Sequence, residues 1–201
     1  MTIKTEFKNV WVDSKHRYYI KDSVVNAPSV TGLFSPSKSF GRNSQKAAAE
    51  GISIHDQIAD FFDRSKRLKD LNPVAQKIIN TAINTRVVSD PYLVHKPSKS
   101  YSIKTELPFV STIINGKEVL RFVGCIDLVV KHAHSIDVVD WKSGSSHAWH
   151  HDQIKAYMLA MNASTGAIVY QDKSKFVTIP NASWTLDLCK KIREWKHKQV
   201  N

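Results

Sequence analysis

The sequence predicts an α/β protein with a mixed central β-sheet flanked by helices. From residue 45 onward, the hydrophobic patterns follow the order helix, helix, three strands, helix, two short strands, helix. Apolar residues make up 42% and charged residues 23% of the 201 positions, which is ordinary for a globular protein. No internal repeat or linker divides the chain, so we expect one domain over residues 1–201.

The first part of the chain combines a small hairpin with two helices. Residues 7–12 and 17–20 alternate loosely around a polar turn, and a polar loop follows, so residues 1–44 are predicted as hairpin and loop. Residues 45–90 form the helical part, with helices over about 45–71 and 73–86. Asn72-Pro73 separates the two helices, because proline cannot continue the first one.

Residues 100–180 carry the predicted sheet. Strands are expected over 101–114, 118–130 and 136–141, with Asn115-Gly116 as a tight turn between the first two. The run Ser143–Ser146 offers a cap for a helix over about 147–162. Short strands over about 167–171 and 176–179 follow, and Ser183 is expected to cap a final helix over 183–199.

Charge and cysteine content restrict the function. The formal net charge of +11 favours an anionic partner, most often a nucleic acid, although solubility alone can also explain it. No apolar run approaches the roughly 18 residues of a membrane span, and the N-terminus lacks an apolar signal core, so we expect no membrane partner and a cytoplasmic or nucleoid-associated protein. Two cysteines cannot form a disulfide framework or a four-thiolate iron–sulfur site.

Two acidic residues interrupt neighbouring apolar strands. Asp127 lies within the apolar run 122–130, and Asp140 ends the strand over 136–141, with Lys142 on the same side two residues later. Antiparallel pairing around the turn at 132–135 places Asp127 next to Asp140. Adjacent buried carboxylates repel each other unless a cation lies between them, and oxygen ligands suit Mg²⁺ or Mn²⁺. The alternatives are a structural Asp127–Lys142 ion pair or a solvent-facing Asp127.

Four short motifs occur in an order typical of one family. They are Gly51-x-x-x-His55, Gly124-x-x-Asp127, Asp140-x-Lys142 and Gln153-x-x-x-Tyr157. The chain resembles the PD-(D/E)XK nuclease superfamily and, within it, the RecB-type exonuclease branch. The segment from Tyr18 to Thr31 is similar to the leader of small phage and mitochondrial genome-maintenance exonucleases. The resemblance implies a restriction-endonuclease-like core.

The resemblance also implies roles for individual residues. His55, Asp127 and Asp140 would bind Mg²⁺ or Mn²⁺ together with the backbone carbonyl of Trp141, and Lys142 would activate the attacking water and stabilise the phosphate. Gln153 and Tyr157 would contact DNA or Lys142. Glu106 would contribute an acid from the first core strand. No iron–sulfur cluster is expected, in contrast to relatives that carry four cysteines for one. A helical His55 beside Ile54 and Ile58 is also typical of a buried core histidine.

Several further residues are candidates for substrate binding. Ser143 and Ser145 suit an anionic phosphate at a helix N-terminus, although capping alone also explains them. Thr31 and Lys38 belong to a loop over 28–42 that is expected to meet the nucleic acid, where Phe34 and Phe40 could stack on bases or pack in the core. His147 and His151 have a spacing that can bind zinc, but no catalytic glutamate accompanies them.

These inferences predict a metal-dependent deoxyribonuclease. The resemblance favours an exonuclease that prefers single-stranded DNA or DNA ends and acts in recombination, replication or repair, in the manner of phage enzymes. The alternatives are a non-catalytic DNA-binding or inhibitor protein on the same fold, and a structure- or sequence-specific endonuclease. A second copy of the chain or other partners are left open.

Overall fold

The computed structural model describes residues 1–13, 17–35, 42–89 and 101–200. A six-stranded sheet has the strand order β1-β5-β6-β7-β8-β9. Neighbouring strands are antiparallel except β7 and β8, which run parallel, so the sheet is mixed as predicted. Its strands are β1 (Thr2–Glu6), β5 (Tyr101–Asn115), β6 (Glu118–His132), β7 (Ile136–Trp141), β8 (Thr165–Val169) and β9 (Ser174–Val177).

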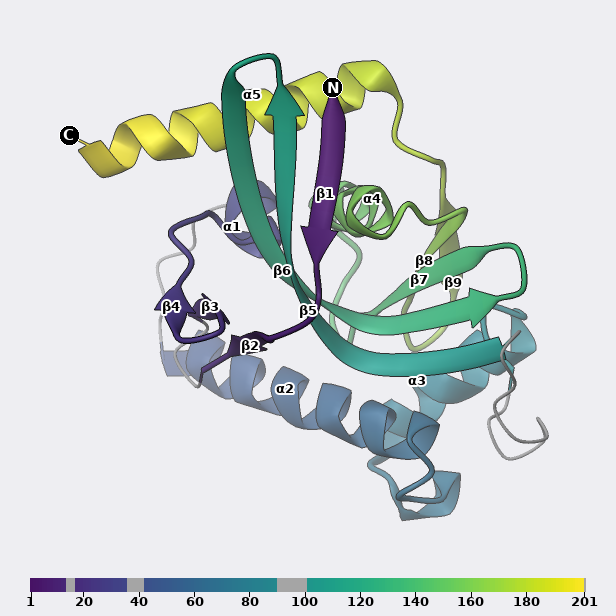
Figure 1. Cartoon of the computed structure of the whole chain (residues 1–201). Coiled ribbons are helices and arrows are strands. Elements are labelled where there is room, and N and C mark those ends of the chain that lie inside the picture. Colours follow the sequence, from purple (N-terminus) through teal and green to yellow (C-terminus); the bar gives the residue numbers. More distant parts are fainter. Residues whose placement is uncertain (14–16, 36–41, 90–100, 201) are drawn as a thin grey trace.

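Helices cover both faces of this sheet (Figure 1). α1 (Val30–Phe34), α4 (Trp149–Met161) and α5 (Ala182–Val200) pack against one face, where Val129 and Val138 are buried. α2 (Arg42–Phe62) and α3 (Pro73–Asn84) pack against the other face, over Leu128, Val130 and Val139. The alternation of successive residues between two apolar layers explains why β6 and β7 read as continuous apolar runs. The predicted fold class is therefore correct.

The β5–β6 hairpin contains the two longest strands of the sheet. Asn115 pairs with Glu118, which leaves a two-residue turn in which Gly116 has a φ of 61°. Glycine adopts this left-handed conformation without a Cβ penalty, as the Asn-Gly signal predicted. The three predicted strands agree with β5, β6 and β7 within two residues at each end, whereas β8 and β9 each begin two residues earlier than expected.

The N-terminal region contains more strand than the sequence indicated. β2 (Val10–Val12) and β3 (Tyr18–Ile20) form the expected hairpin, and β4 (Ser23–Val24) extends it to a three-stranded sheet. β1 was not predicted, because its sequence TIKTE is mostly polar. It is an edge strand that pairs with β5, and such pairing depends on a distant partner rather than on local pattern.

Several helix boundaries differ from the predictions, and α2 begins at Arg42 rather than near residue 45. α2 ends at Phe62 rather than near residue 71, because Arg64 adopts a φ of 62° and Ser65 N–H turns back to the Asp60 carbonyl. A short 3₁₀ helix, Leu68–Asp70, follows. The predicted cap at Ser183 is wrong, since Asn181 Oδ1 accepts the Trp184 N–H at 2.8 Å. None of the helices in the described ranges is long and apolar enough to cross a membrane.

Candidate active site

The hairpin between β6 and β7 brings the two strand aspartates together. Leu128 pairs with Val139 and Val129 with Val138, so Asp127 and Asp140 occupy the next step of the predicted register. Only 8% of Asp127 and 1% of Asp140 are exposed. The Trp141 N–H donates to Asp127 Oδ2 at 2.8 Å, which fixes this carboxylate at the strand end. Both acids therefore lie beside the C-terminal end of β7, where His55 of α2 approaches Asp127.

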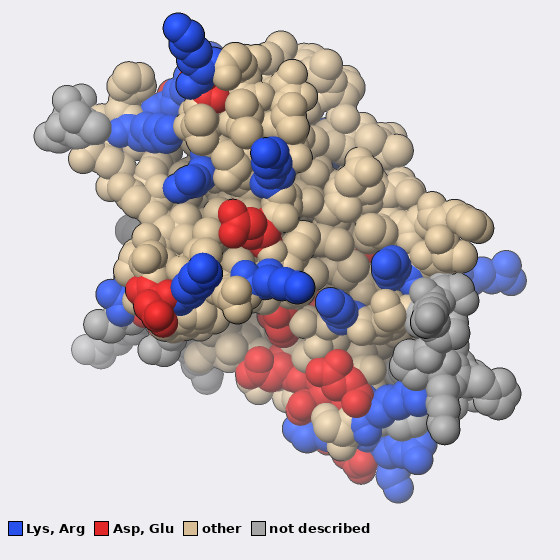
Figure 2. Space-filling model, in the orientation of Figure 1, with Lys and Arg blue, Asp and Glu red and all other residues tan. Residues whose placement is uncertain are grey.

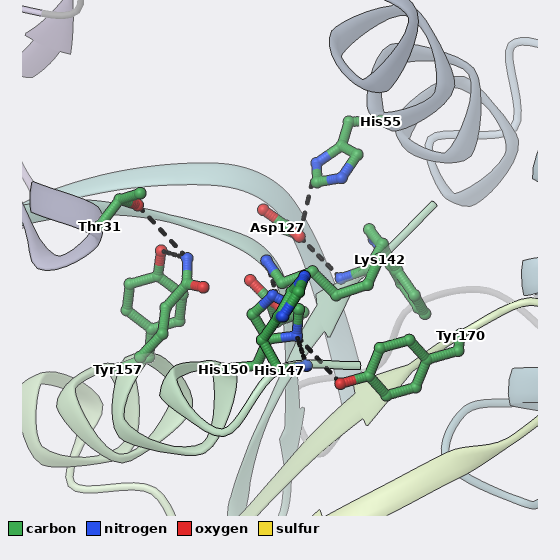
Figure 3. Close-up of polar contacts among 11 residues, drawn as sticks. Thr31, His55, Asp127, Lys142, His147, His150, Tyr157 and Tyr170 are labelled. Atoms are coloured by element: carbon green, nitrogen blue, oxygen red, sulfur yellow. Dashed lines mark hydrogen bonds and ion pairs between the residues drawn. The ribbon is translucent and has the colours of Figure 1, made fainter. Parts of the chain in front are cut away.

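Three potential metal ligands lie close together beside this end of β7. His55 on α2, Glu106 on β5 and Asp127 on β6 each offer one ligand atom, and these atoms all lie within 4.8 Å of one another. His55 Nδ1 is 3.5 Å from Asp127 Oδ2, and Figure 3 shows the imidazole pointing from its helix toward the carboxylate. An imidazole and two carboxylates form a donor set that suits a divalent cation such as Mn²⁺ or Mg²⁺.

Glu106 reaches this cluster through an irregular backbone. Thr105 pairs with Leu128 and Leu107 with Ile126, but the step between them carries no regular pairing, and Glu106 has a φ of 44°. A left-handed conformation at a residue other than glycine costs on the order of 1–3 kcal/mol and concentrates at functional sites. Glu106 Oε2 also accepts a weak bond from the Cys125 thiol at 3.6 Å.

Lys142 is paired with Asp140. Its Nζ lies 2.6 Å from Asp140 Oδ2, and its side chain is 15% exposed. The contact is an ion pair rather than an aligned hydrogen bond, so among the described residues Asp140 Oδ2 has no well-aligned donor. A buried carboxylate oxygen can accept more than one partner, so Asp140 Oδ2 retains acceptor capacity beside its ion pair with Lys142.

Only part of the predicted set of metal ligands lies in one cluster. His55 and Asp127 lie together with Glu106, whereas Asp140 is held by Lys142 outside that three-residue cluster. The Trp141 indole is buried and stacks on Phe62 with ring centroids 5.7 Å apart, which anchors the end of β7. The roles of Asp140 and of the Trp141 carbonyl as ligands stay predictions.

Burial and neighbouring charges shift the pKa values of the three carboxyl groups at the site. Burial raises the pKa of Asp140 to about 6, with Asp127 adding to the shift, and burial raises the pKa of Glu106 to about 7, again with a contribution from Asp127. Burial also acts to raise the pKa of Asp127, but His55, Lys142 and the Trp141 amide outweigh it and hold that pKa below its usual value. Additional positive charge is what such a site attracts.

The two basic groups respond in the opposite direction. Burial acts to lower the pKa of His55, but Asp127 and Asp140 outweigh it and raise that pKa to about 9. Burial likewise opposes the charge on Lys142, yet Asp140 and Asp127 raise its pKa above the ordinary value. The two acidic neighbours therefore favour the protonated form of Lys142.

Residues from α1 and α4 close the other side of the site. Gln153 Nε2 donates to Tyr157 Oη at 2.9 Å and to Thr31 Oγ1 at 3.5 Å (Figure 3). Together with Asp127, Asp140 and Lys142, these side chains line a pocket of about 260 Å³. Gln153, Tyr157 and Thr31 therefore line the same pocket as the acids, and their contact with substrate stays a prediction.

Comparison with known proteins identifies the family. The family model for the PD-(D/E)XK nuclease superfamily matches residues 38–197. This chain belongs to that superfamily. The mixed sheet flanked by helices is the restriction-endonuclease-like arrangement that the resemblance implied. Among solved structures, one described as the crystal structure of SSO0001 is 14% identical, with a TM-score of 0.39, over 74% of this chain and 87% of that chain. No curated protein matches the chain.

The packing around Gly124 explains why the superfamily motif Gly124-x-x-Asp127 begins with a glycine in this chain. A Cβ at Gly124 would lie 2.8 Å from the Phe109 ring and 3.1 Å from the Tyr157 ring. Phe109 and Tyr157 meet edge-to-face, with centroids 6.0 Å apart. Glycine lets α4 approach the sheet closely enough for Gln153 to face the acids.

The serines in the run Ser143–Ser146 do not cap α4. The helix begins at Trp149, and its N-cap, Ala148, makes no side-chain hydrogen bond, so the predicted cap in Ser143–Ser146 is wrong. Ser143 is half-buried, and its carbonyl accepts from Gln171 Nε2 at 2.9 Å, whereas Ser145 is exposed and its Oγ contacts His147 Nε2 at 3.1 Å. Their substrate-binding role stays a prediction, and Lys38 and Phe40 lie outside the described residues.

The histidines near α4 have a structural environment. His150 is buried, and its Nδ1 lies 3.0 Å from Tyr170 Oη (Figure 3). Within the described ranges, the one cluster of three or more residues with metal-binding spacing is His55, Glu106 and Asp127, so zinc binding by His147 and His151 gains no support. Phe34 packs against the core, with its ring 5.9 Å from Trp184.

Sequence reasoning gave no site role to several residues of this pocket, among them three with large or polarisable side chains. Tyr18, Cys125 and Trp149 line the same pocket as the acids, and the Lys142 Nζ lies 5.9 Å from the centroid of the Trp149 ring. Trp149 could have been noticed from its place one turn before Gln153 on the same helix. Tyr18 was noted only as the start of the leader-like segment that ends at Thr31. Cys125 carried no such signal, because a cysteine in a strand is usually a packing residue.

Proposed function

We propose that this protein is a Mg²⁺- or Mn²⁺-dependent deoxyribonuclease of the RecB type. The observation that carries the proposal is the convergence of His55, Glu106 and Asp127, of which His55 and Asp127 share a pocket with the Asp140–Lys142 ion pair. A divalent cation bound by these side chains would neutralise phosphate charge and supply a nucleophilic water. A polyanionic DNA substrate for this nuclease also agrees with the chain's formal net charge of +11.

The chain's own residues have defined tasks in this proposal. Lys142, kept protonated by Asp140 and Asp127, stabilises the negative charge that develops on the phosphate. Gln153 and Thr31, on the opposite wall of the pocket, position the phosphate group relative to the acids. Trp141 fixes Asp127 through its amide and the strand end through its buried indole.

The finer specificity that we propose is exonucleolytic. We expect a preference for single-stranded DNA or DNA ends and a role in recombination, replication or repair. The motifs Gly51-x-x-x-His55 and Gln153-x-x-x-Tyr157 support this, because the resemblance to the RecB-type exonuclease branch rests on them. Their residues His55, Gln153 and Tyr157 line the same pocket as Asp127 and Asp140. The competing assignments are a non-catalytic DNA-binding or inhibitor protein and an endonuclease.

A digestion assay separates these assignments. End-labelled linear and circular single-stranded DNA are incubated with the protein and Mg²⁺, Mn²⁺ or EDTA. We expect the linear strand to be degraded with either metal and the circle to persist. Lys142→Ala and Asp127→Asn should abolish degradation, whereas Lys104→Ala, which removes an exposed lysine of β5, should not.

The alternatives predict other outcomes of the same assay. Cleavage of the circle would identify an endonuclease. If the wild type binds DNA but degrades no more of it with metal than Lys142→Ala does, the protein is a non-catalytic DNA-binding protein. That result would refute the enzyme assignment.

A further inference from the structure

A second hollow continues from the metal-ligand cluster. It is a groove of about 580 Å³ between the β2 hairpin and α2, and Tyr18, His55 and Cys125 line both the groove and the smaller pocket. Figure 1 shows β2 lying alongside α2. The volume is within the range of roughly 300–1,000 Å³ that is typical of ligand sites. A strand whose phosphate lies in the smaller pocket can therefore extend into this groove.

An aromatic platform forms one wall of the groove. Trp11 lines it and stacks on Tyr19, with ring centroids 4.0 Å apart and planes 3° from parallel. The indole N–H donates to the Lys21 carbonyl at 2.8 Å, which fixes the ring. Nevertheless, 45% of Trp11 is exposed. A large aromatic side chain that is held in place but not buried is characteristic of a binding surface.

The platform is fixed before any ligand binds. The Tyr19 hydroxyl donates to Asp13 Oδ2 at 3.3 Å, and Arg17 pairs with the same carboxylate at 2.6 Å. The Arg17 guanidinium also lies 5.9 Å from the Tyr19 ring centroid. Because these contacts hold the hairpin side chains in place, a ligand that stacks on Trp11 pays little conformational entropy.

The charge of the groove selects the base rather than the phosphate. Its carboxylates are Asp13, which is paired with Arg17, and Asp56 and Glu106. In Figure 2, acidic side chains gather on this side of the molecule, where Figure 1 draws α2. Phosphates are repelled by carboxylates, whereas nucleobases offer apolar faces to Trp11 and amino groups to carboxylate oxygens.

We propose that Trp11, stacked on Tyr19, is a subsite for an unpaired nucleobase of the strand whose phosphate occupies the neighbouring pocket. This inference rests on the proposed nuclease function and makes it more specific. A base within a duplex already has both faces covered by its neighbours, so the subsite selects single-stranded nucleic acid or a frayed end.

The experiment measures binding and cleavage separately. Binding of a fluorescein-labelled deoxycytidine oligonucleotide, whose bases carry an amino group, is followed by anisotropy at low salt in EDTA, where no cleavage occurs. We compare the wild type with Trp11→Ala, Trp11→Phe and, as a matched control, Phe176→Ala, which removes an exposed aromatic ring from β9. A series of oligonucleotides with one abasic site at each position in turn then locates the stacked base. Thermal unfolding confirms that each variant is folded.

The expected result is specific to stacking. Trp11→Ala should weaken binding about ten-fold, which corresponds to ~1.4 kcal/mol. Trp11→Phe should retain most of the affinity, and Phe176→Ala should bind as the wild type does. At one position, an abasic site should weaken wild-type binding and abolish the difference between the wild type and Trp11→Ala.

Three results would overturn the subsite: no measurable wild-type binding, equal affinity of Trp11→Ala and the wild type, or an equal loss for every abasic oligonucleotide. The last would show that Trp11 acts only by holding the hairpin. Metal-dependent cleavage by the wild type is scored independently. If base-dependent binding persists without cleavage, the nuclease assignment fails and the subsite remains.

Discussion

Lys142 Nζ lies 2.6 Å from Asp140 Oδ2 at the end of β7, and both groups are largely removed from solvent. The two residues of the Asp140-x-Lys142 motif are therefore linked energetically as well as in sequence. Strand alternation places them on the same side, and the preceding apolar residues bury the pair. Each side chain depends on the other for compensation of its buried charge.

Removal of one member of this pair should destabilise the protein. Lys142→Ala leaves the Asp140 carboxylate buried without its partner, and we expect a loss of about 3–5 kcal/mol in the free energy of unfolding at neutral pH. Urea denaturation in EDTA measures it. The double variant Asp140→Asn with Lys142→Ala should regain part of the loss, because no buried charge remains. If the double variant is less stable than Lys142→Ala, the pair is not coupled as described.

Divalent metal should stabilise the folded protein through the histidine and carboxylate cluster. A cation that binds only the folded state at one hundred times its Kd adds about 2.7 kcal/mol. Mn²⁺ should therefore raise the wild-type Tm, and Asp127→Asn should remove most of this increase. Asp137→Asn is the matched control, since Asp137 lies on β7 and pairs with His132 instead. A Tm increase that survives Asp127→Asn would place the metal elsewhere.

A methyl group at Gly124 should disturb the contact between α4 and the sheet. Gly124→Ala places a Cβ 2.8 Å from the Phe109 ring, and overpacking of this kind costs about 1–3 kcal/mol. Activity should fall as well, because Tyr157 and its partner Gln153 must shift. Gly144→Ala, where a Cβ would meet nothing within 4 Å, should leave Tm and activity close to wild type. Equal Tm values for the two variants would contradict the close packing.

His150 should make the protein less stable in mild acid. Burial lowers the pKa of folded His150 to about 3, whereas an unfolded histidine titrates near ~6.5. The unfolded state therefore binds a proton first as the pH falls below about 6.5, and the folded state loses up to ~1.4 kcal/mol per pH unit. From pH 7 to pH 5, this amounts to at most about 2 kcal/mol.

Urea denaturation at the two pH values tests this expectation. His150→Gln should reduce the difference between them, and His197→Gln, on an exposed part of α5, is the matched control. If His150→Gln and the wild type lose the same free energy between pH 7 and pH 5, His150 does not cause the acid sensitivity.

Local pattern determined much of the sheet and its hairpins. The Asn115-Gly116 turn and the apolar runs around Asp127 and Asp140 fixed three strands and the register between β6 and β7. These features depend on neighbours close in sequence, so pattern and turn chemistry suffice. By contrast, β1 depends on pairing with the distant β5 and was not predicted. The starts of α4 and α5 were mispredicted because several nearby residues could cap each helix and their pattern did not select among them.

The sequence by itself determined the α/β order, the pairing of Asp127 with Asp140 and the motifs that mark the superfamily. Only the tertiary structure decided which groups share the cluster: Glu106 joins His55 and Asp127 because its left-handed backbone interrupts the pairing of β5 with β6, and Asp140 pairs with Lys142 instead. It also placed Trp11 beside the site. A side chain's neighbours across strands and helices depend on backbone direction and packing, which no pattern of residues in one segment specifies.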